Sequence, residues 1–155
     1  MELVQHVYSV LAISTREKFY TSLRGLLPEE RYSPLCWESD VTSARRLLLE
    51  RTFDIVVIST PLPDEFGTKL AMHVVDSSSA GVLLLVGAEH YPDISVRLSP
   101  YGILTLQKPT TPQLILQSLQ LLCGTRERLR KMEQKTASIE EKMAFNSFWF
   151  IGCLF

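Results

Sequence analysis

The residues of this sequence that could do chemistry stand at the ends of apolar segments. Ser14 and Thr15 follow the segment VYSVLAI, Ser59 ends DIVVIS, and Lys108 ends ILTLQK, with Pro109 after it. The carboxyl ends of neighbouring parallel strands meet at one edge of a sheet, where open α/β proteins bind ligands. One interpretation is therefore a neutral or anion-binding pocket that senses a small molecule. Ser59 has no neighbouring His or carboxylate that would activate it as a nucleophile.

Alternating strands and helices must position these residues. Apolar runs over 7–13, 33–37, 54–59, 81–86 and 103–107 predict five strands, and DIVVIS has the β-branched centre of a strand buried on both faces. Helical spacing follows each strand, with Thr15, Asp40 and Thr111 as predicted N-caps. Five short-linked repeats of strand and helix predict an α/β fold, a flavodoxin-like doubly wound parallel sheet.

Composition narrows the class of protein. The chain has 155 residues, 46% hydrophobic and 21% charged, with a net charge of -1, so a whole-chain nucleic-acid surface is not expected. Its three cysteines and three histidines share no metal-ligand spacing, and we expect neither a metal site nor a cofactor. No signal peptide and no run of about 20 apolar residues is present, which predicts a cytoplasmic protein without a membrane span.

Three segments of the sequence resemble the receiver domain of bacterial response regulators over residues 5–122. They are DIVVISTPLPDEFG, LLLVGAE and LTLQKPTT, which match the third strand with its Pro-Asp-x-x-Gly turn, the fourth strand, and the fifth strand with its Lys-Pro. In the family that Lys-Pro bond is cis. The resemblance implies a flavodoxin-like fold and a signalling role, not an enzyme.

The resemblance also places the family's phosphorylation residues on this sequence. The acidic pair falls on Ser14 and Thr15, the phosphoacceptor on Ser59, the switch hydroxyl on Gly87, and the switch aromatic on Thr105; only Lys108 is retained. Aspartyl phosphorylation needs a carboxylate nucleophile and a divalent cation held by hard oxygen ligands. The sequence therefore predicts a degenerate receiver that aspartyl phosphate does not switch.

Two alternatives remain open for this pocket. In the first, the alignment is wrong and Asp54 or Asp64 accepts phosphate, although Asp54 precedes its strand and should lie at the far end. In the second, Lys108 is a structural lysine that satisfies nearby carbonyls instead of binding an anion.

Residues 123–143 predict a coiled coil. Leu122, Leu129, Thr136 and Met143 repeat every seven residues, and Thr125, Met132 and Ile139 occupy the d positions between them. The e positions carry Arg126, Glu133 and Glu140, and the g positions carry Arg128, Lys135 and Lys142. Opposite charges face each other in a parallel pair, whereas the e and g rows of an antiparallel pair would largely face like charges. The pattern therefore favours a parallel homodimer over a solvated single helix.

A receiver-like domain followed by such a coil resembles the antitermination regulators of the AmiR and NasR type. Some of these have receivers without phosphorylation residues and work through dimerisation or a regulatory protein partner. The resemblance implies that RNA is bound through a C-terminal ANTAR module, of which nothing follows Met143. Residues 144–155, AFNSFWFIGCLF, are an atypical apolar tail. Either its aromatic residues Phe145, Phe148, Trp149 and Phe150 cap the dimer, or, as we favour, it derives from a frameshift or truncation.

Overall fold

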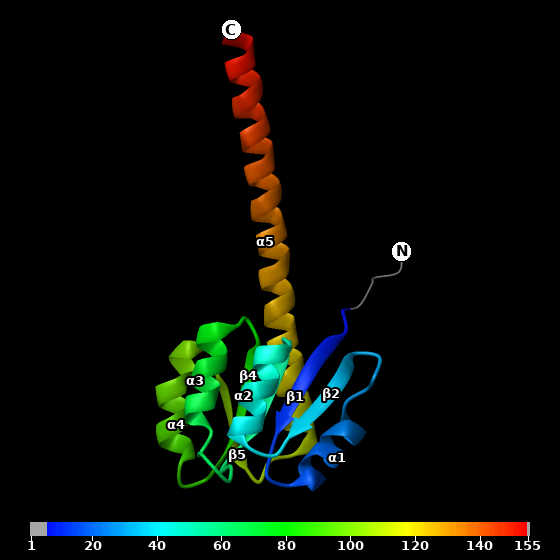
Figure 1. The fold of residues 1–155 in the computed structure, drawn as a ribbon, viewed down its shortest axis with the longest axis vertical. Helices are drawn as coiled ribbons and strands as arrows, with labels where there is room; N and C mark the ends of the chain where they lie inside the picture. Colours follow the sequence, from blue (N-terminus) through cyan, green and yellow to red (C-terminus); the bar gives the residue numbers. More distant parts are fainter. Residues whose placement is uncertain (1–5, 155) are drawn as a thin grey trace. The chain divides into compact units, whose positions relative to one another are not determined.

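The computed structural model describes residues 6–154, and the side chains of residues 6–147. Figure 1 shows strands and helices alternating along the chain. The strands are β1 (Tyr8–Ile13), β2 (Tyr32–Glu38), β3 (Ile55–Ser59), β4 (Gly81–Gly87) and β5 (Leu104–Lys108). The helices are α1 (Glu17–Leu26), α2 (Val41–Glu50), α3 (Thr68–Ser77), α4 (Tyr91–Leu98) and α5 (Pro112–Leu154), with a 3-10 turn, η1 (Ser99–Tyr101).

The five strands form one parallel sheet in the order β2-β1-β3-β4-β5. This is the strand order of flavodoxin-like doubly wound folds, so the predicted fold class is confirmed. β3 is the central strand, and its residues Ile55 to Ile58 are completely buried. The prediction that DIVVIS is covered on both faces is therefore also confirmed.

Successive residues of a strand point to opposite faces, and they divide the core into two layers. Leu11 and Ile13 of β1 pack with side chains from α2, α3 and α4. Val10 and Ala12 of the same strand pack with Leu23 of α1 and with Leu119 and Cys123 of α5. Each helix thus covers one face of the sheet with its apolar stripe, and the strand ends remain accessible at the edge.

Two of the three predicted helix caps are confirmed. The Asp40 carboxylate accepts from the Ser43 N–H at 2.7 Å, and the Thr111 hydroxyl accepts from the Leu114 N–H at 3.2 Å. The prediction that Thr15 caps α1 is wrong. The N-cap is Arg16, without a side-chain bond to the helix, because the Thr15 hydroxyl donates instead to the Pro61 carbonyl at 3.3 Å.

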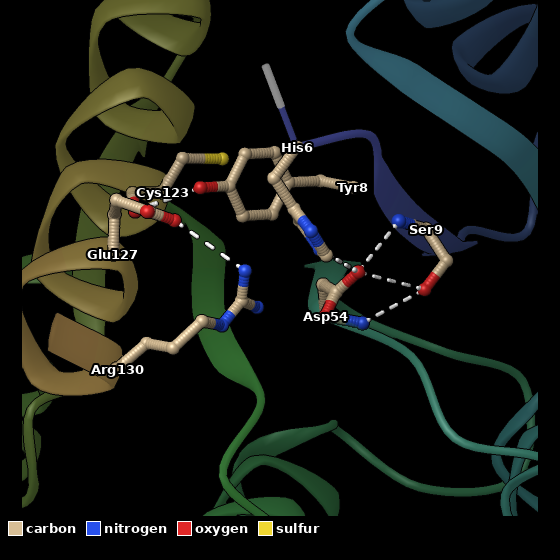
Figure 2. Close-up of polar contacts among 7 residues, drawn as sticks. All are labelled: His6, Tyr8, Ser9, Asp54, Cys123, Glu127 and Arg130. Carbon is tan, nitrogen blue, oxygen red and sulfur yellow. Dashed lines mark hydrogen bonds and ion pairs between the residues drawn. The ribbon is translucent and has the colours of Figure 1, made fainter. Parts of the chain in front are cut away.

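A unit boundary lies within α5, between Cys123 and Gly124. The residues before it belong to the sheet domain, and the Cys123 carbonyl accepts a hydrogen bond from the Tyr8 hydroxyl at 3.3 Å (Figure 2). The helix assignment continues through the predicted tail to Leu154, while the side chains of Phe148, Trp149 and Phe150 lie outside the described residues. Among residues 6–154, no helix is long and apolar enough to cross a membrane.

Replacement of Gly67 by alanine should destabilise the domain by roughly 1–3 kcal/mol. Gly67 has a φ of +124°, and an added Cβ would lie 3.1 Å from the Thr60 Cγ2 and 3.2 Å from the Ile58 Cγ2. Gly25 of α1 is the control, because a Cβ there meets nothing within 4 Å. Gly25→Ala should stabilise the domain by about 0.5–1 kcal/mol. Urea unfolding measures both changes, and equal effects would contradict the conformational argument.

Candidate functional site

A cavity of about 640 Å³ opens at the carboxyl edge of the sheet. It is lined by residues that end or follow β1, β3 and β5, together with residues of α1. They are Ser14, Thr15, Arg16, Lys18, Phe19, Ser22, Ser59, Thr60, Pro61 and Lys108. The structure thus brings together four of the five residues that the sequence assigns to a pocket.

Gly87 is the fifth, and it is not among the lining residues. It pairs with Lys108 in the register of β4 and β5, yet a Cβ at this position would lie nearest the Glu89 carboxylate, at 3.6 Å. Gly87 therefore offers no group to the cavity. Thr105, which falls on the switch aromatic in the resemblance, is buried.

Lys108 is half-buried and reaches from the end of β5 toward the end of β3. Its ammonium donates to the Thr60 carbonyl and to the Ser59 hydroxyl, the latter at 3.4 Å. Burial lowers the pKa of this amine, and the nearby charge of Arg16 lowers the pKa further. Lys108 therefore satisfies a carbonyl, as its structural interpretation requires, while it also lines the cavity. Its peptide bond to Pro109 is cis, as in the family that it resembles.

Ser14 and Thr15 continue β1 into the cavity wall. The Ser14 side chain is buried, and its hydroxyl oxygen accepts from the Arg16 N–H at 3.2 Å. The Ser14 carbonyl accepts from the Trp37 indole N–H at 3.0 Å, which holds the strand end in place. Both serines of the pocket, Ser14 and Ser59, thus accept a hydrogen bond from the protein.

Sequence reasoning missed the cations of this cavity. Arg16 precedes α1 and Lys18 lies in its first turn, and both line the space beside Ser59. The signal that would have found them is their position. Residues that follow a parallel strand at once, or open the next helix, lie at the ligand-binding edge of a doubly wound sheet.

The donor set of the cavity does not suit a divalent cation. Mg²⁺ is bound in proteins through carboxylate oxygens, usually with water and substrate phosphates. The lining residues here offer neutral hydroxyls and carbonyls, and their charged groups are all cations. Among the described residues, no group of three or more His, Cys, Asp or Glu side chains could hold a metal ion.

The two alternative phosphoacceptors lie away from this cavity. Asp54 precedes β3, at the amino end of the strand, and its carboxylate accepts from the Ser9 N–H at 3.0 Å and lies 3.7 Å from the His6 imidazole (Figure 2). Asp64 accepts from the backbone N–H groups of Val41 and Thr42, each at 3.0 Å, at the start of α2. Neither carboxylate is among the lining residues.

The predicted coiled-coil seam is the second candidate site. Leu129, Met132, Ile139 and Met143 are large apolar residues that are each more than half exposed. Leu122, assigned to the same seam, is instead half-buried in the sheet domain, where an added Gly81 Cβ would lie 3.3 Å from the Leu122 Cβ. We therefore assign Leu122 to the domain core. Glu127 and Arg130 form an ion pair of 3.4 Å on this part of the helix (Figure 2).

No protein-family model and no curated protein sequence matches this chain. Solved receiver domains match it in three dimensions. A signal receiver domain of an HD domain-containing protein from Pseudomonas fluorescens Pf-5 is 25% identical, with a TM-score of 0.72, over 84% of this chain and 97% of that one. A response regulator receiver domain protein from Clostridium thermocellum is 17% identical, with a TM-score of 0.70, over 79% of this chain and 99% of that one. The chemotaxis response regulator CheY4 of Vibrio cholerae is 21% identical, with a TM-score of 0.64, over 76% of this chain and 99% of that one.

The sheet domain therefore has the receiver-domain fold of two-component response regulators. Those structures show the fold. The chemistry of this chain has to be argued from its own residues, because one fold can carry unrelated sites.

Asp64→Ala should lower the stability of the domain at neutral pH. The N–H groups of Val41 and Thr42 hold the pKa of the Asp64 carboxyl at about 2, below its ordinary 3.8. The stabilisation that this carboxylate gives is thus complete above pH 3.8 and is lost as the pH falls through 2. Urea unfolding of wild type and variant from pH 7 downward should show a difference that shrinks with acid.

Glu65→Ala is the matched control for this experiment. Glu65 neighbours Asp64, but the interaction of its carboxylate is an exposed ion pair of 3.5 Å with Arg45. Such pairs contribute little to stability. A loss in Glu65→Ala as large as that in Asp64→Ala would contradict the assignment of Asp64 to the start of α2.

Proposed function

We propose that this chain is a non-catalytic, receiver-like signal-input and dimerisation domain that aspartyl phosphorylation does not switch. The observation that supports the proposal is the set of residues at the carboxyl edge of the sheet. Ser14, Thr15 and Ser59 line the cavity where phosphorylation would require carboxylates, and Arg16 and Lys108 bring positive charge to it. A divalent cation would be repelled there, and no carboxylate of the lining could attack a phosphodonor.

Ser59 is a poor substitute for an aspartate nucleophile. A serine hydroxyl attacks phosphorus only when a base removes its proton. The residues that share the cavity with Ser59 include no histidine and no carboxylate, and its oxygen accepts from the Lys108 ammonium. A protonated ammonium cannot accept a proton, so Lys108 in this state does not supply the base that Ser59 would need to accept a phosphate.

Dimerisation is assigned to the seam of Thr125, Leu129, Met132, Thr136, Ile139 and Met143. Four of these residues are large, apolar and mostly exposed in the single chain, which favours burial against a second copy. In a parallel pair, Arg128 would face Glu133 of the second copy, and Lys135 would face Glu140. Each exposed pair contributes on the order of 0.5 kcal/mol, so these charges select the orientation more than the affinity.

We further propose that the output is transcription antitermination in a two-component type of regulator. The support is the resemblance of the domain order, a receiver-like domain followed by a heptad helix, to regulators of the AmiR and NasR type. RNA binding is then assigned to an ANTAR module, and the input to a regulatory protein partner or to a ligand of the cavity. The protein acts in the cytoplasm on this proposal.

Incubation with acetyl phosphate and Mg²⁺ should leave the mass of the protein unchanged. The lining of the cavity supplies neither the nucleophile nor the cation site that an acyl phosphate needs. Intact-mass spectrometry measures the result, with a phosphorylatable receiver domain as the positive control for the reagent. An adduct that Asp54→Asn or Asp64→Asn abolishes would establish the conventional receiver reading and overturn the proposal.

The pair Met132→Glu and Ile139→Glu should convert a dimer into a monomer. Both substitutions place a charge in the seam, where it would be desolvated without a partner. The matched control is Gln134→Glu with Ala137→Glu, which adds the same charge at exposed positions outside the seam. Light scattering of the full chain gives the mass, and a wild-type monomer at micromolar concentration would remove the dimerisation role.

Lys135→Glu should weaken a parallel dimer, and adding Glu140→Lys should restore it. The first change places a glutamate at position 135 of one copy opposite Glu140 of the other, so two negative charges meet. The second change replaces Glu140 by lysine and restores a pair of opposite charges with its order exchanged. Analytical ultracentrifugation at low and high salt measures the dissociation constant of the dimer. If the double variant dissociates as readily as Lys135→Glu, the two residues do not face each other as the parallel register requires.

A further inference from the structure

The cavity at the carboxyl edge presents donors and positive charge. Arg16, Lys18 and Lys108 line it, and no aspartate or glutamate does. Among the residues whose side chains are described, no carboxylate lies within 4.0 Å of the charged nitrogens of these three. Like charges gathered without a counterion repel each other, and an anion placed among them relieves the repulsion.

Several polar side chains of the cavity can donate hydrogen bonds to a ligand. The Ser14 hydroxyl oxygen accepts from the Arg16 N–H, and the Ser59 hydroxyl oxygen accepts from the Lys108 ammonium. A hydroxyl that accepts in this way keeps its own proton to donate. Lys108 has three N–H donors and gives two of them to Ser59 and Thr60. Within residues 6–147, no hydrogen bond engages the third N–H of Lys108 or the hydroxyl protons of Ser14 and Ser59, so these protons can be donated to a ligand.

The size and the apolar part of the cavity indicate more than a bare ion. A volume of about 640 Å³ lies in the range of small-molecule pockets and exceeds what one phosphate fills. Phe19 and Pro61 line the same space and offer apolar surface to an organic group. The ligand that fits both parts has a dianionic head and a small organic body.

We propose that this cavity is a metal-independent binding site for a small phosphomonoester. Its phosphate group accepts hydrogen bonds from Lys108, Ser59 and Ser14 and pairs with the Arg16 guanidinium, and its organic group packs on Phe19 and Pro61. The lowered pKa of Lys108 agrees with this site, because burial and Arg16 destabilise the ammonium until an anion compensates it. The proposal rests on the proposed function, which leaves the input to a regulatory protein partner or to a ligand of this cavity, and it names the chemical class of that ligand.

Isothermal titration of the full chain in EDTA tests the site with phenyl phosphate, inorganic phosphate and phenol. Phenyl phosphate should bind, inorganic phosphate should bind about tenfold more weakly, and phenol should not bind. Equal affinity for the two phosphates would overturn the role given to Phe19 and Pro61. Binding of neither phosphate, or binding only when Mg²⁺ replaces EDTA, would overturn the site.

Arg16→Gln and Lys108→Met should each weaken phenyl phosphate binding by about tenfold or more, since each removes a charged donor. Arg16 is exposed, so its variant keeps the fold even if Lys108→Met does not. The control is Arg24→Gln, which removes the same charge from the last turn of α1, outside the cavity lining. An equal loss in Arg24→Gln, or none in Arg16→Gln, would contradict the proposal.

Intact mass after the titration separates this proposal from the proposed function. Reversible binding leaves the mass unchanged, whereas a covalent phosphate on the protein raises it. A mass increase would refute the proposed function, and the titration variants would still decide the anion site.

Discussion

The contact between the Lys108 ammonium and the Thr60 carbonyl determines the character of the carboxyl edge. β4 lies between β3 and β5 in the sheet. The Lys108 side chain extends from the end of β5 past the end of β4 and contacts Thr60, which follows β3. A half-buried ammonium normally requires a counter-charge, because its desolvation is costly. Here its partners are the Thr60 carbonyl and the Ser59 hydroxyl, both neutral. The cavity therefore retains the positive charge that an acidic cluster would cancel.

On the proposed function, this charge explains how a receiver-domain fold could carry a different chemistry at its carboxyl edge. The sheet order and the two helix layers place the ends of β1, β3 and β5 around one cavity whatever residues occupy them. With carboxylates there, the edge attracts a metal ion; with Ser14, Ser59 and Arg16, it attracts an anion. The inversion needs few residues, because the core that supports the edge lies in other positions. The fold therefore locates the site, and the residues decide its ligand.

The sequence predicts the strands well where a single physical rule applies, and four of its five pocket residues line one cavity. β3 was recognisable because burial on both faces requires a continuous apolar run, and Ser14, Ser59 and Lys108 followed from the ends of such runs. It failed where two local interactions compete. Thr15 was expected to cap α1, but its hydroxyl donates to Pro61, and Arg16 takes the cap position beside the cavity. Leu122 fits the heptad and is also half-buried against the domain beside Gly81, so its place in the seam stays a prediction. Periodicity alone cannot distinguish these partners.

Lys108 of the proposed pocket and the residues of the proposed seam belong to one continuous stretch of chain. Lys108 ends β5, Pro112 begins α5 four residues later, and the same helix carries Leu129 and Met132. A ligand at Lys108 can influence dimerisation only if it binds the monomer and the dimer with different affinities. Linkage then makes the effect reciprocal, so dimerisation must change the ligand affinity by the same factor. A cavity that binds equally in both states would be a ligand site without a regulatory role, whereas unequal binding would give this domain an input that needs no phosphoryl transfer.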